Sequence, residues 1–149
     1  MPQLLIVAHA PLATALRAVA QHTYPDCASL VQALDVAPDE SPEEVEVRLR
    51  ALLAQAGSAE TLILADVFGA TPCNVALRAA DAHRARVVAG VNVPMLWRVL
   101  CYAAEPLEAL VARAVSGATQ GVMQVAVSRP QNQAVKTGSD DQVQHHHQQ

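Results

Sequence analysis

The chain has 149 residues, of which 52% are hydrophobic and 16% charged, with a formal net charge of −4. This length suits one domain with a substantial core, and the acidic balance without a basic cluster argues against a nucleic-acid partner. No apolar run approaches the roughly 18 residues of a membrane helix, and no signal-like leader precedes the first apolar segment. We therefore expect a cytoplasmic protein that is not itself in the membrane.

Short apolar runs alternate with segments of helical periodicity, which predicts an α/β fold with a mainly parallel sheet and helices on both faces. The clearest helix start is at Ser41, where serine stands at the N-cap, proline follows and Glu44 comes three residues later. In chain order the predicted elements are strand 4–8, a helix after Pro11, strand 29–36, a helix from Ser41 to Gly57, strand 61–66, a helix from Thr71 to about His83, strand 86–91, a helix after Pro94, a helix from Pro106 to Gly117, and strand 121–128.

The last twenty residues differ in composition from the rest of the chain. Residues 130–149 are rich in glutamine, contain three consecutive histidines and have almost no apolar side chains. Such a segment buries too little surface to offset the entropy of ordering it. We therefore expect one domain over residues 1–129 followed by a disordered polar tail.

Two of the predicted strands end at a side chain that can take part in a chemical reaction. His9 follows the first strand and Asp66 closes the third. The carboxyl ends of parallel strands meet at one edge of a sheet, where ligands of open α/β sheets collect. There a carboxylate can orient an imidazole and fix its tautomer, which lets the other ring nitrogen act as a nucleophile.

A helix start beside this edge offers a place for an anion. Free amides at the predicted helix N-terminus and the Thr71 hydroxyl are hydrogen-bond donors, and Gly69 lets the backbone come close. This combination indicates phosphoryl transfer on histidine. The three cysteines are far apart and no metal-ligand cluster is evident, so we expect neither a metal nor another cofactor.

Three segments give the chain a resemblance to a known family. The run that ends at His9, residues 66–74 (DVFGATPCN) and residues 90–96 (GVNVPML) occur in the family's order and spacing. Together they resemble the mannose-family IIA component of the bacterial phosphoenolpyruvate-dependent sugar phosphotransferase system (PTS). The resemblance extends over about residues 1–128.

The resemblance implies a flavodoxin-like fold, often dimeric, with the last strand at an edge or exchanged between subunits. It implies that His9 accepts a phosphoryl group from the phosphocarrier protein HPr and that Asp66 orients its ring. Residues 69–71 (Gly69, Ala70 and Thr71) would bind the phosphoryl group, and a neighbouring loop with Asn92 and Pro94 would shape the site. The acceptor would be a separate IIB component or a regulatory target.

Some features depart from the family pattern, and two other functions fit the same residues. Ala10 and Pro11 replace the glycine that usually follows the histidine, and Ala70-Thr71 stands where the family favours Gly-Ser. One alternative is the phosphoryl-donor subunit of dihydroxyacetone kinase, whose IIA-like domain shares the fold. The other is a non-catalytic module that binds an anion or a partner at the same edge. The sequence does not name a sugar, nor does it separate transport from regulation.

Overall fold

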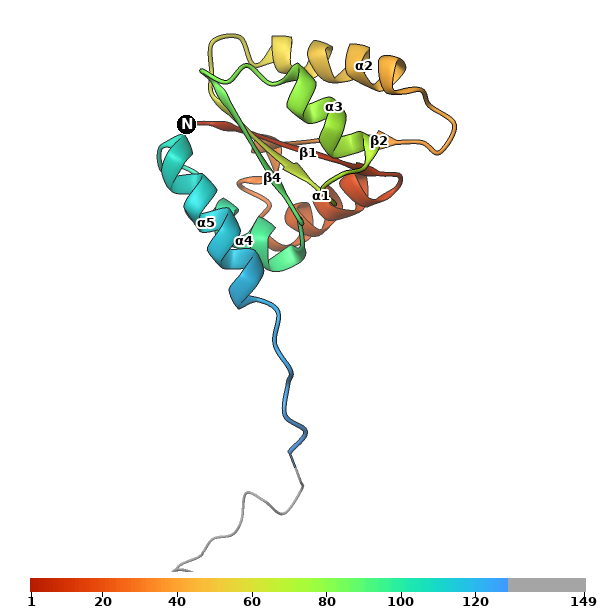
Figure 1. Cartoon of the computed structure of the whole chain (residues 1–149). Coiled ribbons are helices and arrows are strands. Elements are labelled where there is room, and N and C mark those ends of the chain that lie inside the picture. Colours follow the sequence, from red (N-terminus) through yellow and green to blue (C-terminus); the bar gives the residue numbers. More distant parts are fainter. Residues whose placement is uncertain (129–149) are drawn as a thin grey trace, which may run out of the picture.

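The computed structural model describes residues 1–128 and shows a four-stranded, fully parallel sheet (Figure 1). The strand order is β2-β1-β3-β4, so β1 and β3 are central. The strands are β1 (Gln3–His9), β2 (Val31–Val36), β3 (Thr61–Ala65) and β4 (Ala85–Ala89). The predicted parallel sheet is confirmed.

Helices cover both faces of the sheet, as the sequence predicts. In Figure 1, α2 and α3 lie on one side of the strands, and α1, α4 and α5 lie on the other. The helices are α1 (Leu12–Thr23), α2 (Pro42–Gln55), α3 (Thr71–Ala79), α4 (Val93–Cys101) and α5 (Leu107–Gln120), with a short 3₁₀ helix at Ala28–Leu30.

Two cores form because successive side chains of a strand point to opposite faces. On β1, Leu4 and Ile6 pack with α1, α4 and α5, whereas Leu5 and Val7 pack with α2 and α3. All four are essentially inaccessible to solvent. The continuous apolar run at the start of the chain is therefore explained by a central strand that is covered twice.

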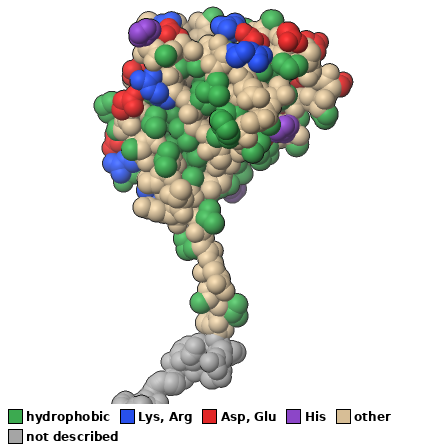
Figure 2. All heavy atoms as spheres, viewed as in Figure 1, with side chains coloured by type: hydrophobic (Ala, Val, Ile, Leu, Met, Phe, Trp, Pro, Cys, Tyr) green, Lys and Arg blue, Asp and Glu red, His purple; other side chains and the backbone are tan. Residues whose placement is uncertain are grey.

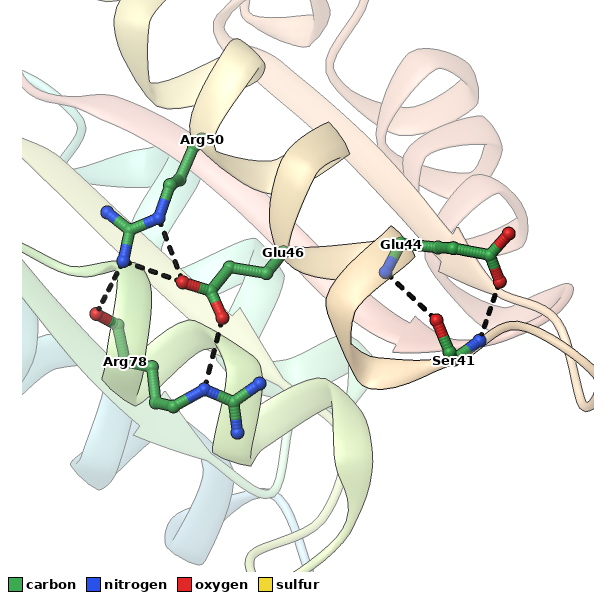
Figure 3. A network of polar contacts seen from close by, with 5 residues as sticks. All are labelled: Ser41, Glu44, Glu46, Arg50 and Arg78. Carbon is green, nitrogen blue, oxygen red and sulfur yellow. Dashed lines mark hydrogen bonds and ion pairs between the residues drawn. The ribbon is translucent and has the colours of Figure 1, made fainter.

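The predicted capping box at the start of α2 is confirmed (Figure 3). The Glu44 amide donates a hydrogen bond to the Ser41 hydroxyl oxygen at 3.1 Å, and the Ser41 amide donates to the Glu44 carboxylate at 2.9 Å. Two amides that the helix itself leaves unpaired are satisfied in this way.

Two predicted helix ends are wrong. The third helix ends at Ala79 rather than near His83, because residues 81–84 form a turn in which the Ala85 amide donates to the Asp81 carbonyl. Gly117 does not end α5, which continues to Gln120. A Cβ at Gly117 would lie 2.7 Å from Cβ of Arg98, so this glycine serves the close approach of α5 to α4.

The predicted last strand is not part of the sheet. Residues 122–128 form no strand and leave the body of the molecule from the end of α5 (Figure 1). A strand needs a partner for its backbone groups, and no residue in 1–128 pairs with this segment. Its apolar side chains are exposed, and Figure 2 shows them along the extended segment. The predicted tail, residues 130–149, lies outside the described residues.

Candidate functional site

The ends of the two central strands bring together the two side chains that the sequence singles out. His9 is the last residue of β1, and Asp66 directly follows β3. Oδ2 of Asp66 accepts a hydrogen bond from Nδ1 of His9 at 2.6 Å and another from the His9 amide at 2.9 Å. One carboxylate oxygen therefore holds both the ring and the backbone of the histidine.

This contact decides which ring nitrogen of His9 faces outward. An ionised carboxylate can only accept hydrogen bonds, so Nδ1 is the nitrogen that carries the proton. Nε2 makes no hydrogen bond to any residue in 1–128, and 53% of the His9 side chain is exposed. A neutral His9 thus presents the lone pair of Nε2 to an incoming group.

Asp66 is held in its charged form. Its side chain is 11% exposed, and this burial by itself raises the pKa. The hydrogen bonds from the amide and ring of His9, the attraction of that ring and the bond from the Val67 amide outweigh burial, and the pKa lies below its ordinary value. The Val67 amide donates to Oδ1 at 2.9 Å, which leaves Oδ2 to His9.

The start of α3 lies on the face of the sheet toward which His9 points. Leu5 and Val7 belong to the core under α2 and α3, so the alternation along β1 directs His9 to the same face. The loop from Asp66 to α3 turns at Gly69, which has a φ of 92°, a conformation that favours glycine. The N-terminal end of the helix dipole therefore belongs to the same edge as the histidine.

Thr71 is not the N-cap of α3, which corrects the prediction. Ala70 takes that position in an extended conformation, and no side chain caps the helix. Thr71 and Pro72 are the first two helical residues, so the amides of Thr71 and Cys73 have no partner within the helix. The Thr71 hydroxyl forms no hydrogen bond to any described residue and is available to a ligand.

The loop that carries Asn92 and Pro94 is tied to the site through its backbone. The Val91 amide donates to the carbonyl of Ala65, next to Asp66. The Asn92 side chain caps α4, with Oδ1 accepting from the Met95 amide at 2.8 Å. Pro94 is a helical residue whose ring faces Gly121. Both side chains thus serve α4 and its contact with α5.

The sequence reading missed a carboxylate that anchors the segment after His9. Asp35, near the end of β2, accepts hydrogen bonds from the hydroxyl of Thr14 at 2.6 Å and from its amide at 3.1 Å. Pro11, at the N-cap of α1, has no side-chain acceptor, so the Asp35 carboxylate accepts from the first turn of the helix in its place. The available signal was an acidic residue near the end of a mostly apolar strand, at the same sheet edge.

Exposed apolar side chains flank the histidine, and the sequence reading missed these as well. Val67 is 48% exposed, Phe68 77% and Leu12 38%. They lie on the loop after Asp66 and at the start of α1, the two segments that border His9. Exposed apolar residues beside a reactive group are typical of a surface that a protein partner covers.

Within residues 1–128, no group of three histidine, cysteine, aspartate or glutamate side chains is arranged to hold a metal ion. In the same residues, no helix has both the length and the apolar character required to cross a membrane. The arrangement at the sheet edge is instead suited to a nucleophilic ring nitrogen with an anion site beside it.

Comparisons with known proteins show the family of the chain and the origin of its fold. Residues 3–115 match the EIIA-man family, described as "PTS system fructose IIA component". A mannose/sorbose-specific IIA subunit of the phosphotransferase system from Enterococcus faecalis is 28% identical, with a TM-score of 0.80, over 86% of this chain and 97% of that one. A search of curated proteins found no match.

Two further solved structures share the fold at lower identity. The phosphotransferase system component EIIA from Streptococcus agalactiae is 22% identical, with a TM-score of 0.75, over 83% of this chain and 97% of that one. A PTS IIA protein associated with the fucose utilization operon of Streptococcus pneumoniae is 24% identical, with a TM-score of 0.67, over 83% and 92% of the two chains.

Proposed function

The chain belongs to the EIIA-man family of PTS IIA components, and from this premise we propose that it is a phosphocarrier whose phosphorylated residue is His9. One observation carries the proposal. Nδ1 of His9 is bound by the Asp66 carboxylate at 2.6 Å, while Nε2 faces solvent without a partner among residues 1–128. This is the arrangement that an imidazole needs to act as a nucleophile in one defined direction.

In the proposed transfer, bonds form and break only between the phosphoryl group and the two histidines. The lone pair of Nε2 attacks the phosphorus of a phosphohistidine donor, and a new N–P bond forms as the N–P bond of the donor breaks. The bonding electrons return to the donor imidazole. The His9 ring becomes positively charged while its Nδ1 keeps its proton, and Asp66 stabilises this charge at 2.6 Å. The same steps in reverse order deliver the group to an acceptor.

The start of α3 supports the phosphoryl group. In the proposal, the amides around Gly69 and Ala70 and the amide and hydroxyl of Thr71 donate to the phosphoryl oxygens, and the helix dipole favours their negative charge. Pro72 leaves one amide fewer for this purpose. Asn92 and Pro94 would shape the adjoining loop by fixing the start of α4.

The proposed partners are proteins. HPr is the donor, and a IIB component or a regulatory target is the acceptor. An exposed histidine flanked by Val67, Phe68 and Leu12 favours docking of a protein surface over enclosure of a small molecule. We also propose a homodimer in which residues 121–128 pair with the sheet of a second copy, because their apolar side chains have no cover in the single chain.

Intact-mass spectrometry tests the proposal. The protein is incubated with phosphoenolpyruvate, enzyme I and HPr, and we expect an acid-labile gain of one phosphoryl group, about 80 Da. His9→Ala should abolish this gain. His22→Ala, which removes an exposed histidine at the end of α1, should retain it. Labelling of His9→Ala would overturn the assignment, and a lack of labelling in the wild type with active donors would favour a module that only binds.

A further inference from the structure

A cavity of about 230 Å³ lies at the opposite edge of the sheet from His9. It opens to solvent and is lined by the C-terminal parts of α2 and α3 and by the first residues of β3 and β4, and its walls include Leu53, Ala79 and Ala85. The volume is about eight times that of a water molecule in the liquid, which suits a ligand of about eight non-hydrogen atoms. The proposed phosphoryl transfer does not use this cavity.

Thr61 gives the cavity a polar group in a buried position. This first residue of β3 is only 5% exposed and lines the cavity. Its side chain faces α2 and α3, because Ile63, two residues along the strand, packs in that core. The Thr61 amide donates to the Arg84 carbonyl, but its hydroxyl forms no hydrogen bond to any residue in 1–128. Nearly all buried hydroxyls have a hydrogen-bond partner, so this one is available to a polar group that enters the cavity.

Two arginines with unused hydrogen-bond donors border the cavity. Nε and Nη2 of Arg50 donate to Glu46, and Nη2 also donates to the carbonyl of Arg78, so the guanidinium is fixed with Nη1 unbonded among the described residues (Figure 3). Nη1 of Arg84 donates to the Gly57 carbonyl at 3.0 Å. Arginine held in this way is suited to binding a carboxylate.

We propose that this cavity binds a small aliphatic carboxylic acid that carries an oxo group a few carbons from the carboxylate. The carboxylate accepts hydrogen bonds from Arg50 and Arg84 at the rim. The carbon chain lies against the alanine and leucine walls, and the oxo oxygen accepts a hydrogen bond from the Thr61 hydroxyl. Each polar group of such a ligand meets a donor that has no partner among residues 1–128.

The charges around the rim select for a single negative charge. Glu46 offsets the charge of Arg50, and Asp81 lies with Oδ2 3.5 Å from Nε of Arg84. A dianionic phosphate or dicarboxylate would meet these two acidic groups. A second carboxylate at the floor would also be buried without a positive partner, which is costly. A monocarboxylate with a neutral oxo group avoids both.

NMR titration of the full-length ¹⁵N-labelled protein with 4-oxopentanoate tests this proposal, with pentanoate as the matched ligand that lacks the oxo group. We expect saturable shifts at Thr61, Ala79 and Ala85, and tighter binding of the oxo acid. Thr61→Val should weaken 4-oxopentanoate about fivefold, as expected for one lost hydrogen bond, and leave pentanoate unchanged. Arg84→Gln should weaken both acids.

Two further variants keep the outcome decisive. Ala79→Leu fills the cavity from its wall and should abolish binding of both acids. Arg48→Gln, on α2 like Arg50 but paired with Glu40 outside the cavity, should leave the affinity for both acids unchanged. An absence of saturable shifts with either acid, or equal 4-oxopentanoate affinity in Thr61→Val and the wild type, would overturn the proposal. Phosphorylation of His9 should be unaffected in Thr61→Val, so the two proposals fail independently.

Discussion

A single carboxylate oxygen of Asp66 holds both the ring and the amide of His9. A contact to the ring alone would leave the ring free to swing with its backbone. Because the Asp66 oxygen also fixes the strand end, the direction of Nε2 follows from the register of β1 and β3. The direction of Nε2 is thus set by the pairing of β1 with β3, and not by the segment that follows His9.

Replacement of Asp66 by asparagine should slow phosphorylation of His9 far more than it destabilises the fold. An amide cannot stabilise the positive ring, and its NH₂ group can bind Nδ1 in the wrong tautomer. A triad histidine that loses its aspartate in this way slows by about 10⁴-fold, and we expect a reduction on the order of 10³-fold here. Rapid-quench labelling with phospho-HPr measures the rate, with thermal unfolding as the control. A rate within about threefold of the wild type would exclude an orienting role.

The lowered pKa of Asp66 also predicts how stability depends on pH. Folding lowers this pKa below its ordinary value of 3.8, so the unfolded chain binds the proton more readily than the folded one. The stabilisation is therefore fully present above the unfolded pKa and is lost as the pH falls through the lower folded pKa. Between pH 5.5 and pH 2, the difference in free energy of unfolding between wild type and Asp66→Asn should shrink.

Urea unfolding at several pH values measures this difference. Asp39→Asn is the matched control, because Asp39 is exposed and its side chain makes no hydrogen bond to any residue in 1–128. The pH dependence of that variant should follow the wild type. A wild-type advantage over Asp66→Asn that increases as the pH falls would contradict the sign of the pKa shift.

His9 and Asp66 were predictable from the sequence because each lies where an apolar strand ends, and parallel strands end at one edge. The position of Thr71 relative to the start of α3 was not predictable in the same way. Thr-Pro resembles a cap followed by the first helical residue, yet here both residues are helical and Ala70 is the cap. The Thr14–Asp35 contact was beyond reach because it joins residues 21 positions apart through a register that the sequence does not state.

Among the helices, the contact between α4 and α5 depends on a glycine. Ending a helix at glycine is a sound expectation from local chemistry, but it fails at Gly117 because a tertiary contact determines that residue. The ideal Cβ would be 2.7 Å from Cβ of Arg98 and 3.2 Å from the carbonyl of Pro94. Apart from residues 121–128, the element types were thus predictable from periodicity. The ends of α3 and α5 were not, since turns and packing set them.

Gly117→Ala should destabilise the protein, although alanine is the better helix former. Helix propensity favours alanine by about 1 kcal/mol, whereas overpacking at a backbone contact costs about 1 to 3 kcal/mol. The clash at Arg98 involves the first side-chain carbon, which cannot move without the backbone, so we expect the cost to exceed the gain. Urea unfolding measures the change, with Val115→Ala on the exposed face of α5 as the control. An increase in stability would show that the two helices can separate without loss.

At the scale of the whole molecule, the two edges of one sheet serve different proposed roles. The C-terminal edge holds the His9 site, and the N-terminal edge holds the cavity above Thr61. Within the described residues, β2 and β4 are the edge strands, and each has a neighbour strand on only one side. An open edge of this kind accepts an additional strand, and the segment after α5 has the composition to supply one.

In the proposed dimer, residues 121–128 have the side-chain pattern of an added strand. Met123, Val125 and Val127 alternate with Gln124 and smaller residues, and the three apolar side chains are 67%, 77% and 94% exposed in the single chain. This period of two is that of a strand with one buried face. A sequence can show such a pattern, but it cannot show on which chain the partner strand lies.

Val125→Asp should therefore convert the dimer to a monomer, because it would bury an unpaired charge on the apolar face of the added strand. Gln124→Asp places the same charge on the opposite face and should leave the dimer intact. Light scattering coupled to size-exclusion chromatography, over a range of protein concentrations, distinguishes the two states. A wild-type monomer at all concentrations would contradict the exchange of residues 121–128, and so would an unchanged dimer in Val125→Asp. In either case the labelling of His9 should persist, since its contact with Asp66 lies within one chain.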